Sequence, residues 1–139
     1  MTANDYKKQL VDFLMKDGYN VNEDNDMVIV IHNYQGSDNG VAMFFEVRDL
    51  NTDLGDVVEL ETSMIIGFQL RKTDKELICL RDRIAQAFGV SLVKMEKDMY
   101  ILKIRNICAE ATTLNAAAAW GINCIFGALR MIGVSVVRK

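Results

Sequence analysis

The C-terminal half of this chain changes its hydrophobic spacing twice, from helical to alternating and back to helical. Turn and capping residues mark the joints: Thr73 and Glu76 form a capping box, and Lys97 with Asp98 makes a tight turn. This order predicts a helix, a β-hairpin and a second helix that pack into one core. The expected elements are a helix over residues 75–88, strands over 91–96 and 99–105, and a long helix over 107–131.

The N-terminal half adds a further helix and at least two strands. Apolar residues at helical spacing predict a first helix that ends before Gly18, where a left-handed residue is favoured. An unbroken apolar run then predicts a central strand buried on both faces. The expected elements are a helix over residues 4–17, strands over 27–32 and 41–49, turns over 35–40 and 53–56, and a short terminal strand over 134–137.

Residues 57–70 fit two patterns. The β-branched side chains and the alternation favour a strand, whereas Asp56 as a cap and the charge pattern after it favour a helix. We expect a short helix over residues 56–65 and an extended piece over 67–70. The order of elements is then α-β-β-(α or β)-α-β-β-α, which predicts a single α+β domain over residues 1–139, with an antiparallel sheet packed against helices.

Length and composition fit a globular protein that needs no disulfide or metal to fold. The chain has 139 residues, of which half are apolar and a quarter charged. Its longest apolar-rich run is interrupted by Asn123 and ends at Arg130, too short for a bilayer span, and its polar N-terminus is unlike a signal peptide. We therefore expect a cytoplasmic protein without a membrane partner.

The sequence holds few of the residues that catalytic and metal sites need. Its one histidine, His32, fits a structural position at a strand end, and its three cysteines form no CxxC pair. Glycine-rich phosphate loops and a nucleophile elbow are also missing, so we expect neither a cofactor nor a metal. An acidic group lacks calcium-loop spacing and is interpreted as a solvated turn. The cysteines are Cys79, Cys108 and Cys124, and the acidic residues are Asp49, Asp53, Asp56, Glu59 and Glu61.

Charge is distributed unevenly along the chain. Residues 1–62 hold four basic and thirteen acidic side chains, a net of −9, whereas residues 63–139 hold twelve basic and six acidic ones, a net of +6. This asymmetry indicates either a basic partner-binding surface or two separately solvated halves. Four basic side chains fall on the solvent side of the predicted hairpin and two more on the helix before it, and we expect this basic strip to contact a partner. Its residues are Arg81, Arg83, Lys94, Lys97, Lys103 and Arg105.

The last helix has more small and apolar surface than one sheet face needs. Part of that surface is therefore expected to meet a symmetry mate and form a homodimer. The expected dimer contacts are Ala117, Trp120, Cys124 and Ile125.

Two resemblances to known families accompany these patterns. Turn and apolar positions over about residues 26–130 resemble a group of uncharacterised small bacterial and phage domains. This resemblance implies a phage or mobile-element setting and no more, and it assigns no catalytic residue. It rests on Asp53 and Gly55, Leu60, Gly67, the helix with Leu77 and Ile84 that ends in Phe88-Gly89-Val90, the hairpin and the closing helix.

The front of the chain gives the second resemblance. Leu14, Gly18, Tyr19 and Val21 before the apolar strand are similar to YbjN-like proteins and type III secretion chaperones. That resemblance implies a helix, three strands, a helix, two strands and a helix, in a homodimer that holds partner peptides.

Together these patterns favour a non-catalytic protein-binding module that caps or sequesters a partner protein, in an anti-defence or chaperone-like role. One alternative is a nucleic-acid-associated factor that uses the basic hairpin between Lys94 and Arg105, although stacking aromatics are missing from that strip. A second alternative is an enzyme with a carboxylate-based site.

Overall fold

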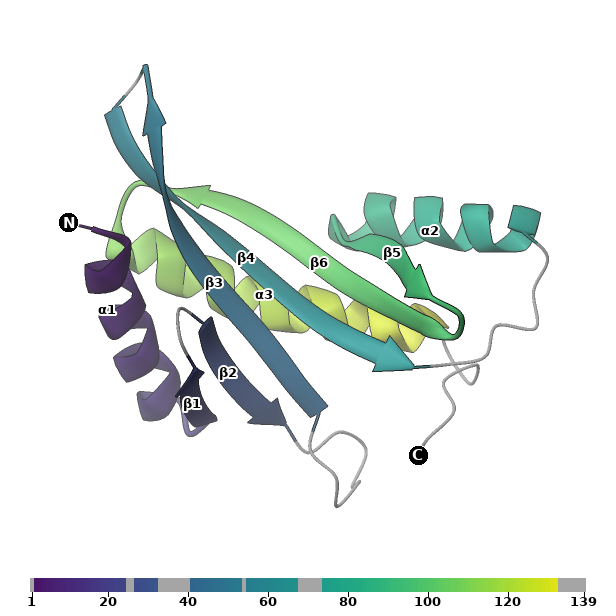
Figure 1. Ribbon diagram of the computed structural model, residues 1–139, viewed down its shortest axis with the longest axis horizontal. Helices are drawn as coiled ribbons and strands as arrows, with labels where there is room; N and C mark the ends of the chain where they lie inside the picture. Colours follow the sequence, from purple (N-terminus) through teal and green to yellow (C-terminus); the bar gives the residue numbers. More distant parts are fainter. Residues whose placement is uncertain (1, 25–26, 33–40, 54, 68–73, 133–139) are drawn as a thin grey trace.

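The computed structural model describes residues 2–24, 27–32, 41–53, 55–67 and 74–132. Within them the chain forms three helices and a six-stranded antiparallel sheet with the strand order β1-β2-β3-β4-β6-β5, which confirms the α+β fold (Figure 1). The elements are α1 (Ala3–Lys16), β1 (Asn20–Asp24), β2 (Met27–His32), β3 (Val41–Thr52), β4 (Gly55–Gly67), α2 (Asp74–Phe88), β5 (Ser91–Glu96), β6 (Met99–Cys108) and α3 (Ala111–Ile132).

The three helices form one layer on one face of the sheet. The long helix α3 runs behind β4 and β6 in the view of Figure 1 and contacts both of these strands. It also contacts the other two helices, since α1 packs beside it against β1 and β3, and α2 packs beside it against β5. No helix among the described residues covers the opposite face, which we call the open face.

Alternation along each strand separates the core from the open face. On β2 the side chains of Val28 and Val30 are buried under the helices, whereas Ile29 and Ile31 are only half-buried on the open face. The expected burial of this strand on both faces is therefore wrong. Its continuous apolar run gives the open face part of its apolar surface.

The prediction of a helix over residues 56–65 is also wrong, because this segment is part of strand β4. Val58, Leu60, Met64 and Ile66 alternate along it and are buried under the helix layer. Pairing with β3 on one side and β6 on the other satisfies its backbone groups, which outweighs the weak helix signal of a capping residue. The expected extended piece over 67–70 lies outside the described residues, apart from Gly67.

Several boundaries differ from the expected ones. Strand β3 continues to Thr52 rather than ending at 49, and Gly55 and Asp56 of the turn expected over 53–56 belong to β4. Strand β1 was not predicted, because its sequence is polar and shows no apolar alternation; antiparallel pairing with β2 holds it in place. The last helix begins at Ala111 rather than at 107, since β6 continues to Cys108, where it pairs with Val58.

The first helix follows its sequence signals closely. Thr2 and Asp5 form a capping box at its start, and Gly18 adopts a φ of +87° just after its end. The expected turn over 35–40, the Thr73 part of the second capping box and the strand over 134–137 lie outside the described residues. Among the described helices none has the length and apolarity that crossing a membrane requires.

Candidate functional site

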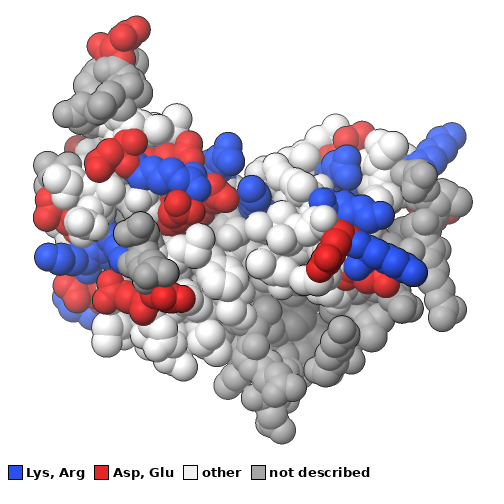
Figure 2. All heavy atoms as spheres, in the orientation of Figure 1, with Lys and Arg blue, Asp and Glu red and all other residues white. Residues whose placement is uncertain are grey.

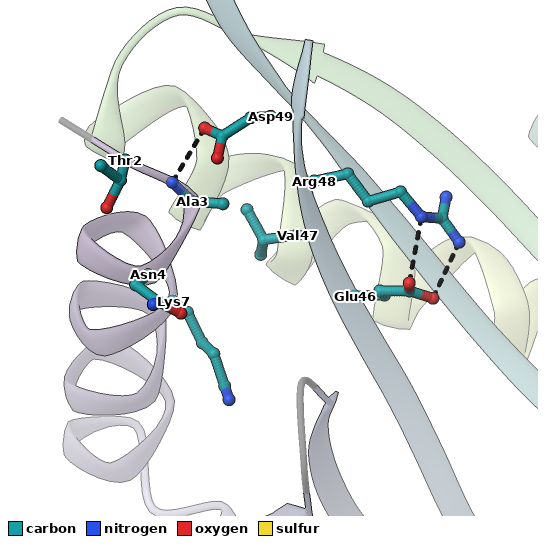
Figure 3. Close-up of a pocket in the computed structure, with 8 residues that line it drawn as sticks. All are labelled: Thr2, Ala3, Asn4, Lys7, Glu46, Val47, Arg48 and Asp49. Atoms are coloured by element: carbon teal, nitrogen blue, oxygen red, sulfur yellow. Dashed lines mark hydrogen bonds and ion pairs between the residues drawn. The ribbon is translucent and has the colours of Figure 1, made fainter.

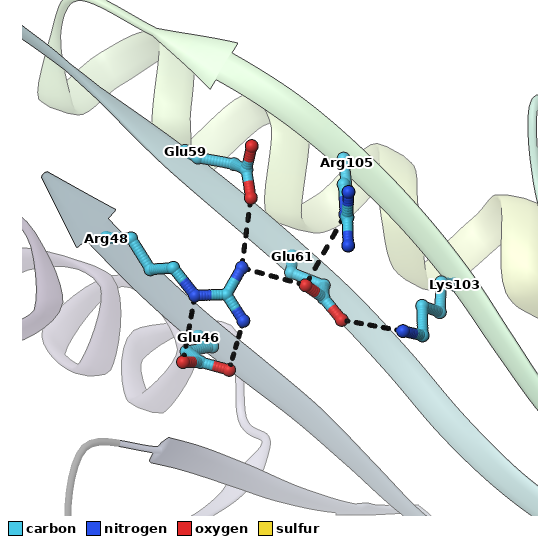
Figure 4. Close-up of polar contacts among 6 residues, drawn as sticks. All are labelled: Glu46, Arg48, Glu59, Glu61, Lys103 and Arg105. Carbon is cyan, nitrogen blue, oxygen red and sulfur yellow. Dashed lines mark hydrogen bonds and ion pairs between the residues drawn. The ribbon is translucent and has the colours of Figure 1, made fainter. Parts of the chain in front are cut away.

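The open face carries an ion-pair network at its centre. Three neighbouring strands contribute to it, because Glu46 of β3 pairs in register with Glu61 of β4, and Glu61 pairs with Arg105 of β6. Side chains of directly paired residues share one face of a sheet. Three carboxylates and three cations therefore meet on this face (Figure 4); they are Glu46, Arg48, Glu59, Glu61, Lys103 and Arg105.

Arg48 holds the three carboxylates together. Its guanidinium makes a bidentate contact with Glu46, with the Nε–Oε1 distance at 3.0 Å and the Nη2–Oε2 distance at 2.8 Å. Its Nη1 donates to Glu59 at 3.0 Å and to Glu61 at 2.9 Å. The hydrogen bond to Glu61, together with the one to Glu46, outweighs desolvation and raises the pKa of the Arg48 guanidinium above its ordinary value.

Glu61 is the most enclosed member of the network. Besides Arg48 it contacts Lys103, with Nζ 3.6 Å from Oε1, and Arg105, with Nε 3.5 Å from Oε2. Burial raises the pKa of this carboxyl, but the hydrogen bond from Arg48 and the charges of the three cations outweigh that effect, so the pKa of Glu61 is lowered from its ordinary value. Glu61 is therefore ionised at neutral pH and has no proton to give as a general acid.

The network exposes its cations more than its carboxylates. The Arg105 side chain is 60% exposed and Arg48 41%, whereas the Glu61 side chain below them is 10% exposed. The carboxylates thus lie against the sheet and the positive groups face solvent. Chemically, such an arrangement offers donors to an incoming carboxylate or other acceptor.

An apolar row lies beside this network on the same face. Ile65 of β4 pairs with Ile101 of β6, which in turn pairs with Val93 of β5, so the three side chains stand next to one another across three strands. Ile65 and Val93 are 42% and 44% exposed. Uncharged surface extends beside the clustered charges in the space-filling view (Figure 2). We call Ile65, Ile101 and Val93 the apolar row.

The structure does not bring the six residues of the expected basic strip onto one surface. Lys103 and Arg105 lie on the open face and contact Glu61. Lys94 pairs in register with Tyr100, whose side chain is buried under the helix layer, so Lys94 belongs to the other face. Lys97 is in the hairpin turn.

The remaining two residues of that strip, Arg81 and Arg83, are exposed on α2. They therefore belong to the helix layer and not to the open face.

The expected dimer contacts on α3 divide in a similar way. Cys124 and Ile125 are buried in the core of the single chain, so they are not available to a symmetry mate. Ala117 packs partly against the core, and Trp120 is the exposed member of the set. The helical spacing does not show which side of α3 is buried, so the expected dimer surface included two residues of the core.

A shallow hollow of about 270 Å³ lies between the start of α1 and strand β3 (Figure 3). Asp49 accepts a hydrogen bond from the backbone nitrogen of Ala3 at 2.9 Å, and so satisfies one of the unpaired donors at the helix start. This carboxylate fixes α1 against β3. Its role here is structural.

The other candidate chemical groups are placed as follows. Burial raises the pKa of the thiols of Cys108 and Cys124, which makes them poor nucleophiles, and Cys79 is exposed on α2. Within the described ranges no three His, Cys, Asp or Glu side chains come close enough to hold a metal ion. Glu59 and Glu61 bind Arg48, and the His32 side chain lies outside the described residues.

Glu46 and Arg48 are the members of the network that sequence reasoning missed. The sequence did indicate that these side chains share a face, because Phe44, Glu46 and Arg48 follow one another at intervals of two along a strand. Pairing this strand with β4 was needed to show that the acidic residues lie opposite Arg48.

No protein-family model matches the sequence, and comparisons with curated proteins and with solved structures give no significant match.

Proposed function

We propose that this protein is a non-catalytic binding module that caps a partner protein through its open face. The supporting observation is the apolar row next to a network whose cations face solvent. The chemistry that fits this surface is a protein segment with apolar side chains flanked by Asp or Glu. Apolar contact would supply affinity, and the cations would select acidic neighbours.

The cations of the network are preorganised for such a contact. Arg48 is held by three carboxylates, and Lys103 and Arg105 each contact Glu61. Less side-chain entropy is lost on binding when the donors are already in place. An exposed apolar row on a sheet face is likewise typical of an interaction surface.

The same charges argue against the nucleic-acid alternative. Three carboxylates balance the three cations of the open face, and Lys94 lies on the other side of the sheet. A phosphate backbone carries a charge at every nucleotide and would find no continuous basic strip along this face.

A displayed peptide library provides the test, because the partner need not be known beforehand. We expect selection on the wild-type protein to enrich peptides that combine apolar residues with Asp or Glu. Ile65→Asp should weaken binding of the selected peptides at least about tenfold, since it places a charge in the apolar row. Arg105→Glu should weaken the same peptides mainly through a slower association rate.

Met15→Asp is the matched control, because Met15 is also exposed but lies on α1 in the helix layer. This variant should bind the selected peptides as the wild type does. Peptides without an acidic or apolar preference would contradict the proposal, as would equal binding by the Ile65→Asp and Met15→Asp proteins.

A further inference from the structure

We propose that strand β5 takes up an extended segment of another protein as a seventh strand of the sheet, in a groove that it forms with helix α2. This contact lies at the edge of the sheet and goes beyond the binding at the open face, with which it shares only Val93. The segment that fits is a short β-strand of apolar and β-branched residues.

The outer edge of β5 offers main-chain hydrogen bonds. In the described sheet β5 is the last strand and pairs only with β6. Every second residue of an antiparallel outer strand directs its N–H and C=O away from its neighbour, so such an edge is a template for a further strand. The register with β6 is regular from Ser91 to Lys94, and the irregularity of β5 comes after it.

The opposite edge of the sheet is much less suited to this contact. Strand β1 is polar and acidic apart from Val21, and its other four residues are exposed. Charged outer strands disfavour pairing with a further strand. In β5 the regular part instead has Leu92 buried and Val93 44% exposed, while Lys94 and Glu96 flank the irregularity near the hairpin turn. An apolar segment is therefore expected at β5 and not at β1.

Helix α2 makes this edge one wall of a groove. The helix lies on the outer side of β5, away from β6, in the view of Figure 1. Three residues of the helix and three of the strand line an open groove of about 360 Å³: Arg81, Asp82, Ala85, Ser91, Leu92 and Val93. A strand added to β5 alternates its side chains between the two faces. Those on the helix side meet Ala85 and Leu92, and those on the other side continue the apolar row beyond Val93.

The position of α2 favours a single strand over a second copy of this chain. A second β5 paired antiparallel to the first would bring its own α2 to the same junction, because each α2 lies on the outer side of its strand. Packed helices need about 8–10 Å between their axes, whereas paired strands are only about 4.8 Å apart. The two helices would therefore compete for one space. A segment without a helix of its own meets no such obstacle.

Peptide selection on a protein with an altered open face tests the groove. Ile65→Asp disrupts the contact proposed for the apolar row and leaves β5 unchanged. We expect a displayed library of random peptides to yield sequences with a short apolar, β-branched run on this variant. Main-chain N-methylation of such a peptide should weaken its binding at least about tenfold at alternate residues only, because every second N–H bonds to β5.

A blocking substitution in the same background locates the binding site. Ala85→Trp fills the groove from the exposed flank of α2 and should weaken the selected peptides at least about tenfold. Ala87→Trp is the matched control, because Ala87 is also exposed on α2 but does not line the groove, and it should leave binding unchanged.

Three results would each overturn this strand addition. They are a selection that yields no such peptides, binding that Ala85→Trp leaves unchanged, and equal losses at every N-methylated position. Peptides selected on the wild type that lose affinity with Ile65→Asp bear on the open face alone, so failure of one proposal is distinguishable from failure of the other.

Discussion

At the scale of single residues, Glu61 organises the open face. Register places it directly opposite Glu46, and two like charges in that position repel each other. Arg48 removes the conflict, because its guanidinium contacts both carboxylates, and Lys103 and Arg105 approach Glu61 from the next strand. Glu61 can be buried as an ion because three cations surround it.

Removing the charge of Glu61 should therefore destabilise the protein. We expect Glu61→Gln to lower the free energy of unfolding by about 1–3 kcal/mol, a range reduced by the partial exposure of its partners. Urea unfolding measures this change. Glu59→Gln is the comparison, since Glu59 makes one ion pair in the described part of the chain and should lose less. Equal losses in the two variants would show that Glu61 has no special role.

The lowered pKa of Glu61 predicts a pH dependence with a definite sign. A carboxyl whose folded-state pKa lies below its unfolded value of 4.5 contributes stability above that pH and loses it as the pH falls through the folded value. The stability difference between the wild type and Glu61→Gln should therefore be largest near pH 7 and shrink below about pH 4.5. Urea midpoints across this range test it, and a difference that grows on acidification would contradict it.

At the scale of elements, two glycines set how closely α3 approaches its neighbours. A Cβ at Gly121 would lie 2.9 Å from Thr62 Oγ1 of β4, and a Cβ at Gly127 would lie 2.5 Å from the Phe88 ring of α2. The small residues of α3 thus allow the helix to sit directly on the sheet and against α2. These two contacts account for the absence of a side chain at both positions.

Gly127→Ala should destabilise the protein by about 1–3 kcal/mol, because the aromatic ring and the helix backbone must move apart. Thermal or urea unfolding measures the loss. Adding Phe88→Leu should recover part of it by shortening the side chain that the new methyl group meets. Asn123→Ala, on the exposed side of the same helix, is the control and should change stability by less than about 0.5 kcal/mol. A neutral Gly127→Ala would mean that α2 and α3 are farther apart than described.

At the scale of the whole molecule, the sheet cancels part of the charge asymmetry along the chain. The acidic half supplies Glu46, Glu59 and Glu61, whereas the basic half supplies Lys103 and Arg105 through the pairing of β4 with β6. The two halves neutralise each other at the centre of the open face. Two residues of the basic segment, Lys103 and Arg105, therefore contact a carboxylate of the acidic half.

This cancellation predicts weak binding to nucleic acid. Random single- or double-stranded oligonucleotides should show no binding at micromolar protein near 0.15 M salt, because the net charge is −3 and two of the candidate basic residues are paired. Fluorescence anisotropy is a suitable measurement. A micromolar affinity that falls steeply with salt would instead favour the nucleic-acid alternative.

The sequence by itself determined the elements whose signals are local. The capping box of Thr2 and Asp5, Gly18 and the turn at Lys97 and Asp98 mark their boundaries through nearby atoms, so α1 and the β5–β6 hairpin agree closely with expectation. The α+β class followed from the order of these elements.

Tertiary structure decided what depends on distant partners. Residues 56–65 became a strand because β3 and β6 pair with it, and β1 exists because β2 holds it. The candidate site is of the same kind: three strands bring Arg48, Glu61 and Arg105 together, and no periodicity within one strand reveals that contact. Spacing along the chain fixes which face a side chain takes, whereas register between strands fixes which charges meet.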